Sequence, residues 1–297
     1  SDILYMLSFK FCMNPNLSKI IYKNMAKIRQ FAVKKLGNIK NDEIEFVLLQ
    51  LVQAIKYEDT NDLRLGDYLV NRCCKDVNLS SGLYWFLNVE SDEEKKENEI
   101  SQETKNYRTI KSELEKKFSN DVRLNIENQI QLRGKLSKIA NDIVKSGKYN
   151  NKEKKVKGLS DMIKSNGEND MSKFDKPLNV PLDPKIAVTS VVPEKCLIFD
   201  SAKWPIKYSF NISNESREHF KKENEYYDVM FKSGDDIRQD QLILQIIAYM
   251  DKLLKNQTRD MEFTTYKVLA TSKNDGFVEF VTGSKTIDSV IKLTDKD

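Results

Sequence analysis

Histidine is almost missing from this sequence, with one residue, His219, among 297. It lies in the charged stretch SREHFKKENE, where an exposed loop residue is far more frequent than a catalytic one. Chemistry that needs a histidine therefore has almost no place here. The four cysteines, Cys12, Cys73, Cys74 and Cys196, fit neither a disulfide framework nor a C-x-x-C metal site, since adjacent cysteines rarely pair. We expect a reducing, intracellular setting.

Long apolar runs are also absent. The longest, Phe46 to Val52, is interrupted by Gln50 and is far too short to span a bilayer. The 49 basic and 45 acidic residues are interspersed, so the net charge of +4 favours neither a nucleic acid nor a membrane partner by itself. The length suffices for two domains with their own cores. We expect a soluble or peripheral protein with no transmembrane segment and no nucleic-acid partner.

Helical spacing of apolar residues dominates the first half of the chain. One stripe contains Ile21, Met25, Ile28, Ala32 and Leu36, and the next contains Ile44, Val47, Leu48, Leu51 and Ile55. Further helices are predicted over about Leu63 to Cys74, from Ser80, over Asn106 to Phe118 and over Leu124 to Val144. Short loops between them favour a small α-helical solenoid. The basic stretch Lys145 to Lys157 fits a membrane-touching patch or, as we interpret it, a solvated linker.

The pattern changes at Lys176, where KPLNVPLDPKIAV carries three prolines that favour extended chain. Short β-branched or aromatic runs follow and predict strands. They are Ile186 to Val192, Cys196 to Phe199, Ile206 to Phe210, Tyr227 to Lys232, Tyr266 to Thr271 and Gly276 to Val281. One helix, about Asp236 to Lys255, interrupts them, with apolar residues including Ile243 and Met250 predicted to face a core. The fold class is therefore α+β, with a helical domain at 1–160, a linker at 161–184 and a sheet-containing lobe at 185–297.

The stretch DVMFKSGDDIRQDQLILQ places Lys232 at the end of a predicted strand. Asp235 and Asp236 are expected in the first turn of the next helix, where carboxylates favour the positive end of the macrodipole. Asp240 shares a helix face with Ile243, so a carboxylate turned toward the sheet needs a partner, and Lys232 is the nearest candidate. Kinases use such a strand lysine and helix acid to hold ATP phosphates. A purely structural ion pair fits the same pattern.

The stretches FKSGDDIRQDQLILQIIAYMDKLLK, YKVLATS and GFVEFV resemble the amino-terminal kinase lobe of phosphoinositide 3-kinases, most closely the class III, vacuolar-sorting type. PLNVPLDPKIAV and IFDSAKWP are similar to the entry of that lobe. FVLLQLVQAIKYE and LVNRCCKDVNLSSGLYWFLNVE resemble the family's helical domain. The resemblance runs from about Arg29 onward. It implies a helical solenoid followed by a lobe with an antiparallel sheet and one major helix, with the carboxy-terminal lobe absent from this sequence.

The resemblance also implies roles for particular residues. Lys232 would be the catalytic lysine on the ATP phosphates, with Asp240 and Tyr266 forming a polar pocket beside it. A loop from Phe199 to Trp204 would fold over the phosphates, and the hinge would bind adenine through backbone groups. The implied nucleotide-binding residues are Phe199, Ser201, Ala202, Lys232, Asp240, Tyr266, Glu279, Phe280 and Val281. For Tyr266 and Phe280 a core position, and for Ser201 a turn position, is the structural alternative.

For the parent enzyme, the resemblance implies transfer of the ATP γ-phosphate to the 3-hydroxyl of phosphatidylinositol at a membrane, with Mg²⁺ or Mn²⁺. The family's catalytic loop and metal-binding segment follow the hinge and have no counterpart here, so we expect no metal ligand in this chain and no activity from it alone. A phosphatidylinositol 4-kinase and a noncatalytic helical scaffold with a relic lobe remain as alternatives. The family also implies a regulatory protein-kinase-like subunit, a coiled-coil partner, and a cytoplasmic location on endosomal or autophagic membranes.

Overall fold

The structure is a computed structural model that describes residues 6–7, 19–59, 61–92, 99–145, 149–164, 170–218, 226–285, 287 and 290–291. His219 and Cys12 lie outside these residues, as does the rest of the segment 219–225. The described chain has a helical half and a half built on one antiparallel sheet, and this confirms the α+β fold class. The two halves share a hydrophobic core that continues from one to the other.

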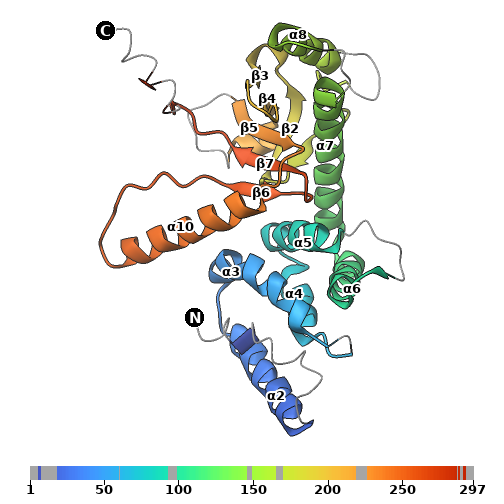
Figure 1. The fold of residues 1–297 in the computed structure, drawn as a ribbon, viewed down its shortest axis with the longest axis vertical. Coiled ribbons are helices and arrows are strands. Elements are labelled where there is room, and N and C mark those ends of the chain that lie inside the picture. The colour runs from blue at the N-terminus through green and yellow to red at the C-terminus, as the bar shows by residue number, and fades with distance from the viewer. Residues whose placement is uncertain are drawn as a thin grey trace.

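In the helical half the first helices pack against one another, whereas the last two lie alongside the sheet (Figure 1). Its elements are α2 (Lys19–Leu36), α3 (Asn41–Ala54), η2 (Ile55–Tyr57), α4 (Arg64–Cys73), α5 (Val77–Ser91), α6 (Gln102–Lys117), α7 (Asn120–Lys145) and α8 (Lys152–Ile163). The stripe predicted for α3 is confirmed at Ile44, Leu48 and Leu51, which are fully buried or nearly so. Helix α5 begins after Asp76, whose side chain accepts from Leu79 N at 3.0 Å and caps the helix.

The interpretation of Lys145 to Lys157 as a solvated linker is wrong over its second part. Residues from Lys152 form the first turns of α8, and Lys155 is buried, with its Nζ 3.0 Å from the Ile143 carbonyl oxygen. A lysine buries its aliphatic stem readily when its ammonium finds an acceptor, which composition alone does not reveal. The predicted domain limits remain a prediction.

The sheet is seven-stranded and antiparallel, in the order β1-β2-β4-β5-β7-β6, with β3 paired to β4. Its strands are β1 (Leu178–Val180), β2 (Asp183–Val191), β3 (Leu197–Ile198), β4 (Ile206–Ile212), β5 (Tyr226–Ser233), β6 (Val268–Ala270) and β7 (Asp275–Glu279), joined by η4 (Pro193–Lys195) and α9 (Asn214–Arg217). All six predicted strands are present with shifted ends. Strand β1 was missed, and it lies in the segment predicted as a linker.

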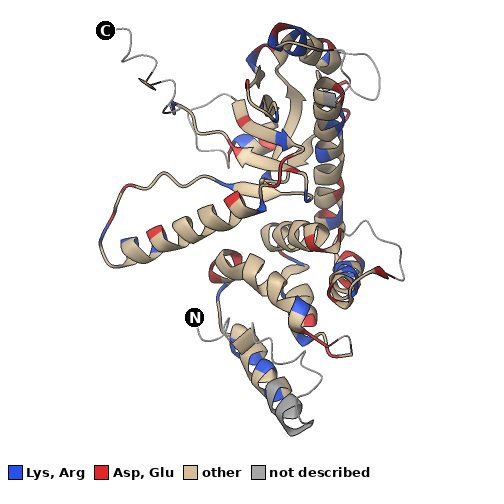
Figure 2. Cartoon of the chain, in the orientation of Figure 1, with Lys and Arg blue, Asp and Glu red and all other residues tan. Residues whose placement is uncertain are grey.

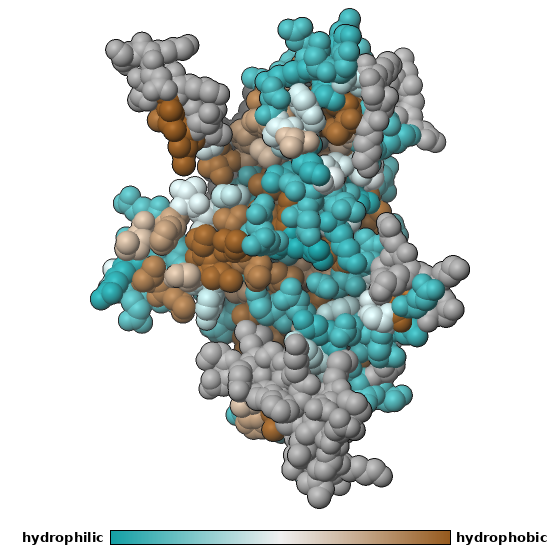
Figure 3. Space-filling view, viewed as in Figure 1, coloured by the Kyte–Doolittle hydropathy of each residue, from teal (hydrophilic) through white to brown (hydrophobic). Residues whose placement is uncertain are grey.

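Helix α10 (Arg238–Asn256) projects beyond the sheet (Figure 1). The prediction that its apolar residues face a core is wrong for Ile243, Ile246, Met250 and Leu253, which are 47%, 46%, 54% and 47% exposed. Figure 3 shows apolar surface where α10 meets the sheet. A helical stripe identifies which face is apolar, but it does not reveal what covers that face.

Charged residues of both signs lie scattered over both halves of the described chain (Figure 2). Among the residues described, no helix is both long and apolar enough to cross a bilayer.

Candidate functional site

Strand alternation places Lys232 on the face of β5 opposite the core. Phe231 is fully buried, whereas the Lys232 side chain is 24% exposed. The Lys232 Nζ lies 3.3 Å from Asp235 Oδ2 and 3.7 Å from Asp240 Oδ2. The predicted pairing with Asp240 is present, but Asp235 provides the nearer carboxylate. The Asp240 side chain is 56% exposed, so its charge is not desolvated as the sequence indicated.

The turn between β5 and α10 has a defined backbone. Gly234 has φ +74°, a left-handed conformation that glycine adopts without strain. The Asn274 carbonyl oxygen accepts from Gly234 N at 2.7 Å and from Asp235 N at 3.0 Å. Helix α10 begins at Arg238, so Asp235 and Asp236 precede it, and the prediction that they lie in its first turn is wrong. The Arg238 side chain bonds Asp236 and lowers the pKa of that carboxyl.

The loop from Phe199 to Pro205 contacts the end of β7. Its ends are joined by Phe199 N donating to the Pro205 carbonyl at 3.0 Å, and Trp204 has φ +48°, a strained conformation for a residue with a large side chain. The Phe199 and Phe280 rings stack with their centroids 6.3 Å apart. Ser201 and Ala202 are exposed in the turn. The structure therefore brings the predicted phosphate loop and the predicted hinge together.

Sequence reasoning missed a buried charge pair beside this stack. The Lys207 Nζ lies 2.8 Å from Asp228 Oδ2 and 4.9 Å from the centroid of the Phe280 ring. Both side chains are largely buried, at 11% and 17% exposed. The available signal was a lysine inside the apolar run of β4, between Ile206 and Tyr208. The pair places a cation beside the aromatic ring that the family resemblance predicts to flank the hinge.

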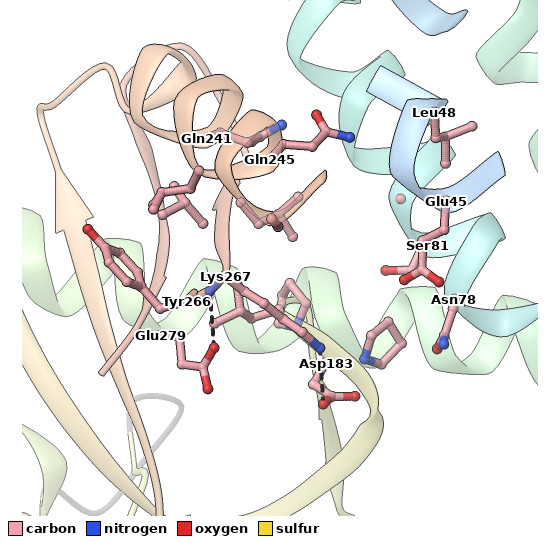
Figure 4. A pocket seen from close by; sticks show the side chains of 18 of the residues that line it. Glu45, Leu48, Asn78, Ser81, Asp183, Gln241, Gln245, Tyr266, Lys267 and Glu279 are labelled. Carbon is pink, nitrogen blue, oxygen red and sulfur yellow. Dashed lines mark hydrogen bonds and ion pairs between the residues drawn. The ribbon is translucent and has the colours of Figure 1, made fainter. Parts of the chain in front are cut away.

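Tyr266 and Glu279 line a separate cavity of about 450 Å³ between the two halves (Figure 4). Glu279 Oε2 accepts from Lys267 N at 3.0 Å, and Tyr266 is 36% exposed just before β6. Lys232 does not line this cavity. The predicted residues thus fall into three groups: Lys232 with Asp240, Phe199 with Phe280, and Tyr266 with Glu279. Val281 follows β7, and its carbonyl oxygen accepts from Ser284 Oγ at 2.7 Å.

Within the described ranges, no group of three or more His, Cys, Asp or Glu side chains is arranged to hold a metal ion. The cationic groups on these elements include Lys232 at the end of β5 and the exposed Lys203 in the loop after β3, in addition to Lys207, which is paired with Asp228. Ammonium groups suit phosphate oxygens. Lys232 and Lys203 therefore carry the charge that binding of phosphate oxygens needs.

Comparison with known families covers both halves of the chain. Residues 14–125 match the family described as "Phosphoinositide 3-kinase family, accessory domain (PIK domain)", and residues 226–296 match "Phosphatidylinositol 3- and 4-kinase". The chain belongs to the phosphoinositide 3-kinase family. The second matched segment contains the predicted residues from Lys232 to Val281, whereas Phe199, Ser201 and Ala202 lie between the two matched segments.

Curated relatives from this family resemble nearly the whole chain. Phosphatidylinositol 3-kinase VPS34 of Candida albicans is 33% identical over 313 residues, covering 92% of this chain and 30% of the relative. Phosphatidylinositol 3-kinase pik3 of Schizosaccharomyces pombe is 31% identical over 277 residues, covering 89% and 32%. The root isoform of phosphatidylinositol 3-kinase from Glycine max is 32% identical over 265 residues, covering 86% and 30%. The chain thus spans about a third of the length of these phosphoinositide 3-kinases.

Proposed function

We propose that this chain supplies one wall of the ATP site of a lipid kinase that phosphorylates the 3-hydroxyl of phosphatidylinositol, giving phosphatidylinositol 3-phosphate. The observation that carries the proposal is Lys232, which ends a strand and pairs with acids before and within the next helix, inside the segment similar to kinases. Kinases hold ATP phosphates with such a strand lysine. The relatives' names, all phosphatidylinositol 3-kinases, support the choice of hydroxyl.

Each group of candidate residues has a role in this proposal. Lys232 neutralises phosphate charge, with Asp240 beside it, whereas Tyr266 lines the separate cavity together with Glu279. Ser201 and Ala202, in the turn after Phe199, cover the phosphates. The stack of Phe199 on Phe280 closes the mouth of the site, and backbone groups of Glu279 and Val281 bind adenine.

ATP is used with Mg²⁺ or Mn²⁺ in this proposal, and the metal would neutralise charge on the transferring phosphate. We assign its ligands to no residue of this chain. Because phosphoryl transfer depends on positioning and on that metal, the 297-residue chain by itself is expected to be inactive.

The proposed setting follows the same resemblance. The parent would work in the cytoplasm, peripherally on endosomal or autophagic membranes that present the lipid. It would assemble with a regulatory protein-kinase-like subunit and a coiled-coil partner. A 4-kinase is the second candidate, because the matched kinase family includes both regiospecificities.

The test is the lipid product of the longer parent protein, given phosphatidylinositol, ATP and Mg²⁺, beside its Lys232→Met variant. We expect the 3-phosphate, with a rate about 10²–10³-fold lower in the variant, as for loss of one preorganised charge-stabilising group. The fold should survive, since a partly exposed ion pair contributes only about 0–1 kcal/mol. Lys164→Met is the matched control, because Lys164 also pairs with a carboxylate, at 2.7 Å from Glu194, but lies just after α8.

Three results would contradict the proposal. Equal rates in the parent and Lys232→Met would remove the role of the lysine. A 4-phosphate product would establish the second candidate. No lipid product from a folded parent would favour the noncatalytic scaffold.

A further inference from the structure

Helix α7 presents a polar stripe to the sheet. Arg133, Ser137 and Asn141 are spaced four residues apart, which places them on one face of the helix. The Arg133 Nη2 lies 2.5 Å from Asp275 Oδ2, and its Nε donates to Asp275 Oδ1 at 3.3 Å. Ser137 Oγ donates to Asp275 Oδ2 at 3.4 Å, and Asn141 Oδ1 accepts from Ser233 Oγ at 3.4 Å. All three side chains thus bind the same end of the sheet.

The strand ends bound by this stripe adjoin Lys232. Ser233 of β5 lies opposite Asp275 of β7, and the next pair in the register is Lys232 with Gly276. Asn274, immediately before Asp275, accepts both backbone hydrogen bonds of the turn that carries Asp235. A displacement of Asp275 would therefore move Lys232 through the neighbouring strand pairing of β5 with β7. It would also move Asp235, the carboxylate nearest to Lys232, through the hydrogen bonds from the turn to Asn274.

The carboxylate at the centre is buried and fully engaged. The Asp275 side chain is 7% exposed and accepts from Thr271 Oγ1 at 2.7 Å in addition to the α7 donors. The Thr271 carbonyl in turn accepts from Asn88 Nδ2 of α5 at 3.0 Å. A guanidinium that binds a buried carboxylate through two nitrogens fixes the orientation of the carboxylate and also stabilises the pair. Helices α5 and α7 thus hold the β6–β7 connection from two sides.

We propose that Arg133 is a positioning residue for Lys232: through Asp275, with Ser137 and Asn141 beside it, helix α7 sets where the lysine ammonium lies relative to the ATP phosphates. The inference rests on the proposed function. A positioning role differs from a simple contact between the two halves, because it requires the Lys232 ammonium to move when Arg133 is substituted.

The test measures that position directly in the parent protein. The probe is an acyl phosphate of ATP. A lysine held beside the phosphates attacks its carbonyl carbon, an amide forms, the amine proton passes to solvent and ATP leaves. Mass spectrometry of the Lys232 peptide, with and without excess ATP, gives the ATP-protected labelling rate. We expect Arg133→Met to lower this rate by about 10- to 100-fold, as for displacements near 1 Å. Arg133→Lys keeps the positive charge but loses the two-nitrogen contact of the guanidinium with Asp275. Its ATP-protected labelling rate should lie between the rates of the unmodified parent and Arg133→Met.

Arg123→Met is the matched control, since Arg123 is an exposed arginine of the same helix that donates to the Glu115 carbonyl. Its labelling rate should equal that of the unmodified parent. If Arg133→Met fails to give a folded protein by circular dichroism, Asp275→Asn takes its place, because asparagine keeps the side-chain shape and removes the charge. The same fall is expected.

The outcomes separate the two proposals. ATP-protected labelling of Lys232 that is unchanged in folded Arg133→Met, or in folded Asp275→Asn, would overturn the positioning role and leave the proposed function standing. Absence of ATP-protected labelling in the unmodified parent would overturn the proposed function and this inference with it. A fall that appears equally in Arg123→Met would also overturn the positioning role.

Discussion

Glu58 is a buried carboxylate that caps a helix from a distance in sequence, and its removal should destabilise the chain strongly. The residue is 4% exposed. Its Oε1 accepts from Leu65 N at 2.8 Å and its Oε2 from Gly66 N at 3.0 Å, in the first turn of α4. The residue before α4, Leu63, has no side chain able to cap the helix. Arg29 Nη2 completes the site, 3.5 Å from Glu58 Oε1.

The magnitude follows from what Glu58→Ala leaves behind. Two backbone N–H groups lose their acceptor at about 1–3 kcal/mol each, and breaking a buried ion pair by removing one partner typically costs about 3–5 kcal/mol. These contributions overlap, so we expect the free energy of unfolding to fall by about 3–5 kcal/mol. Glu58→Gln should cost less, because the amide keeps one oxygen for the helix and Arg29 also donates to the carbonyls of Leu7 and Ala54.

Urea denaturation of the 297-residue chain, followed by far-ultraviolet circular dichroism, measures the effect. Asp62→Ala is the control: Asp62 pairs with Arg64 at 2.7 Å in the same region, but the two side chains are 39% and 44% exposed. Its cost should stay below about 1 kcal/mol. If Glu58→Ala costs no more than Asp62→Ala, the reasoning about the buried cap is refuted.

The pH dependence of the free energy of unfolding provides a second test of Glu58, because the direction of its pKa shift predicts the direction of the change. Burial raises the pKa of Glu58 above 4.5, against the opposing effect of its two N–H donors and Arg29. A raised folded-state pKa contributes stability that is present below the unfolded value of 4.5 and is lost as pH rises through the folded value. The stability difference between the unmodified chain and Glu58→Gln should therefore narrow as pH rises from 4.5. A difference that widens would contradict the assigned direction.

Two further predictions concern packing and thiol chemistry. Gly276→Ala should destabilise the chain by about 1–3 kcal/mol in the same denaturation assay, because its Cβ would lie 2.4 Å from the Leu269 carbonyl oxygen. Gly134→Ala, which has open space around the new Cβ on α7, should instead stabilise the chain by about 0.5–1 kcal/mol. Equal effects of the two substitutions on the free energy of unfolding would contradict this prediction. Burial raises the pKa values of Cys73 and Cys196 to about 12, so both should alkylate at about pH 8 far more slowly in the folded than in the unfolded chain, and rapid labelling under native conditions would contradict it.

Several site features were predictable because they depend on residues close in sequence. Alternation along β5 separates the buried Phe231 from Lys232, and a lysine followed by three aspartates within eight residues leads to an ion pair whichever acid is nearer. The choice between Asp235 and Asp240 was not predictable. It depends on the left-handed Gly234 and on two hydrogen bonds to the Asn274 carbonyl, across the sheet.

The sequence by itself determined most of the helices and strands, though not β1 or α8, and the location of the candidate lysine, since hydrophobic period and strand alternation act locally. It also determined that α10 has an apolar face. Only the tertiary structure decided that this face is exposed, that Phe199 stacks on Phe280, and that Arg133 reaches Asp275 across 142 positions. The physical reason is that exposure, stacking and buried ion pairs depend on which surfaces meet, and no local pattern encodes the partner.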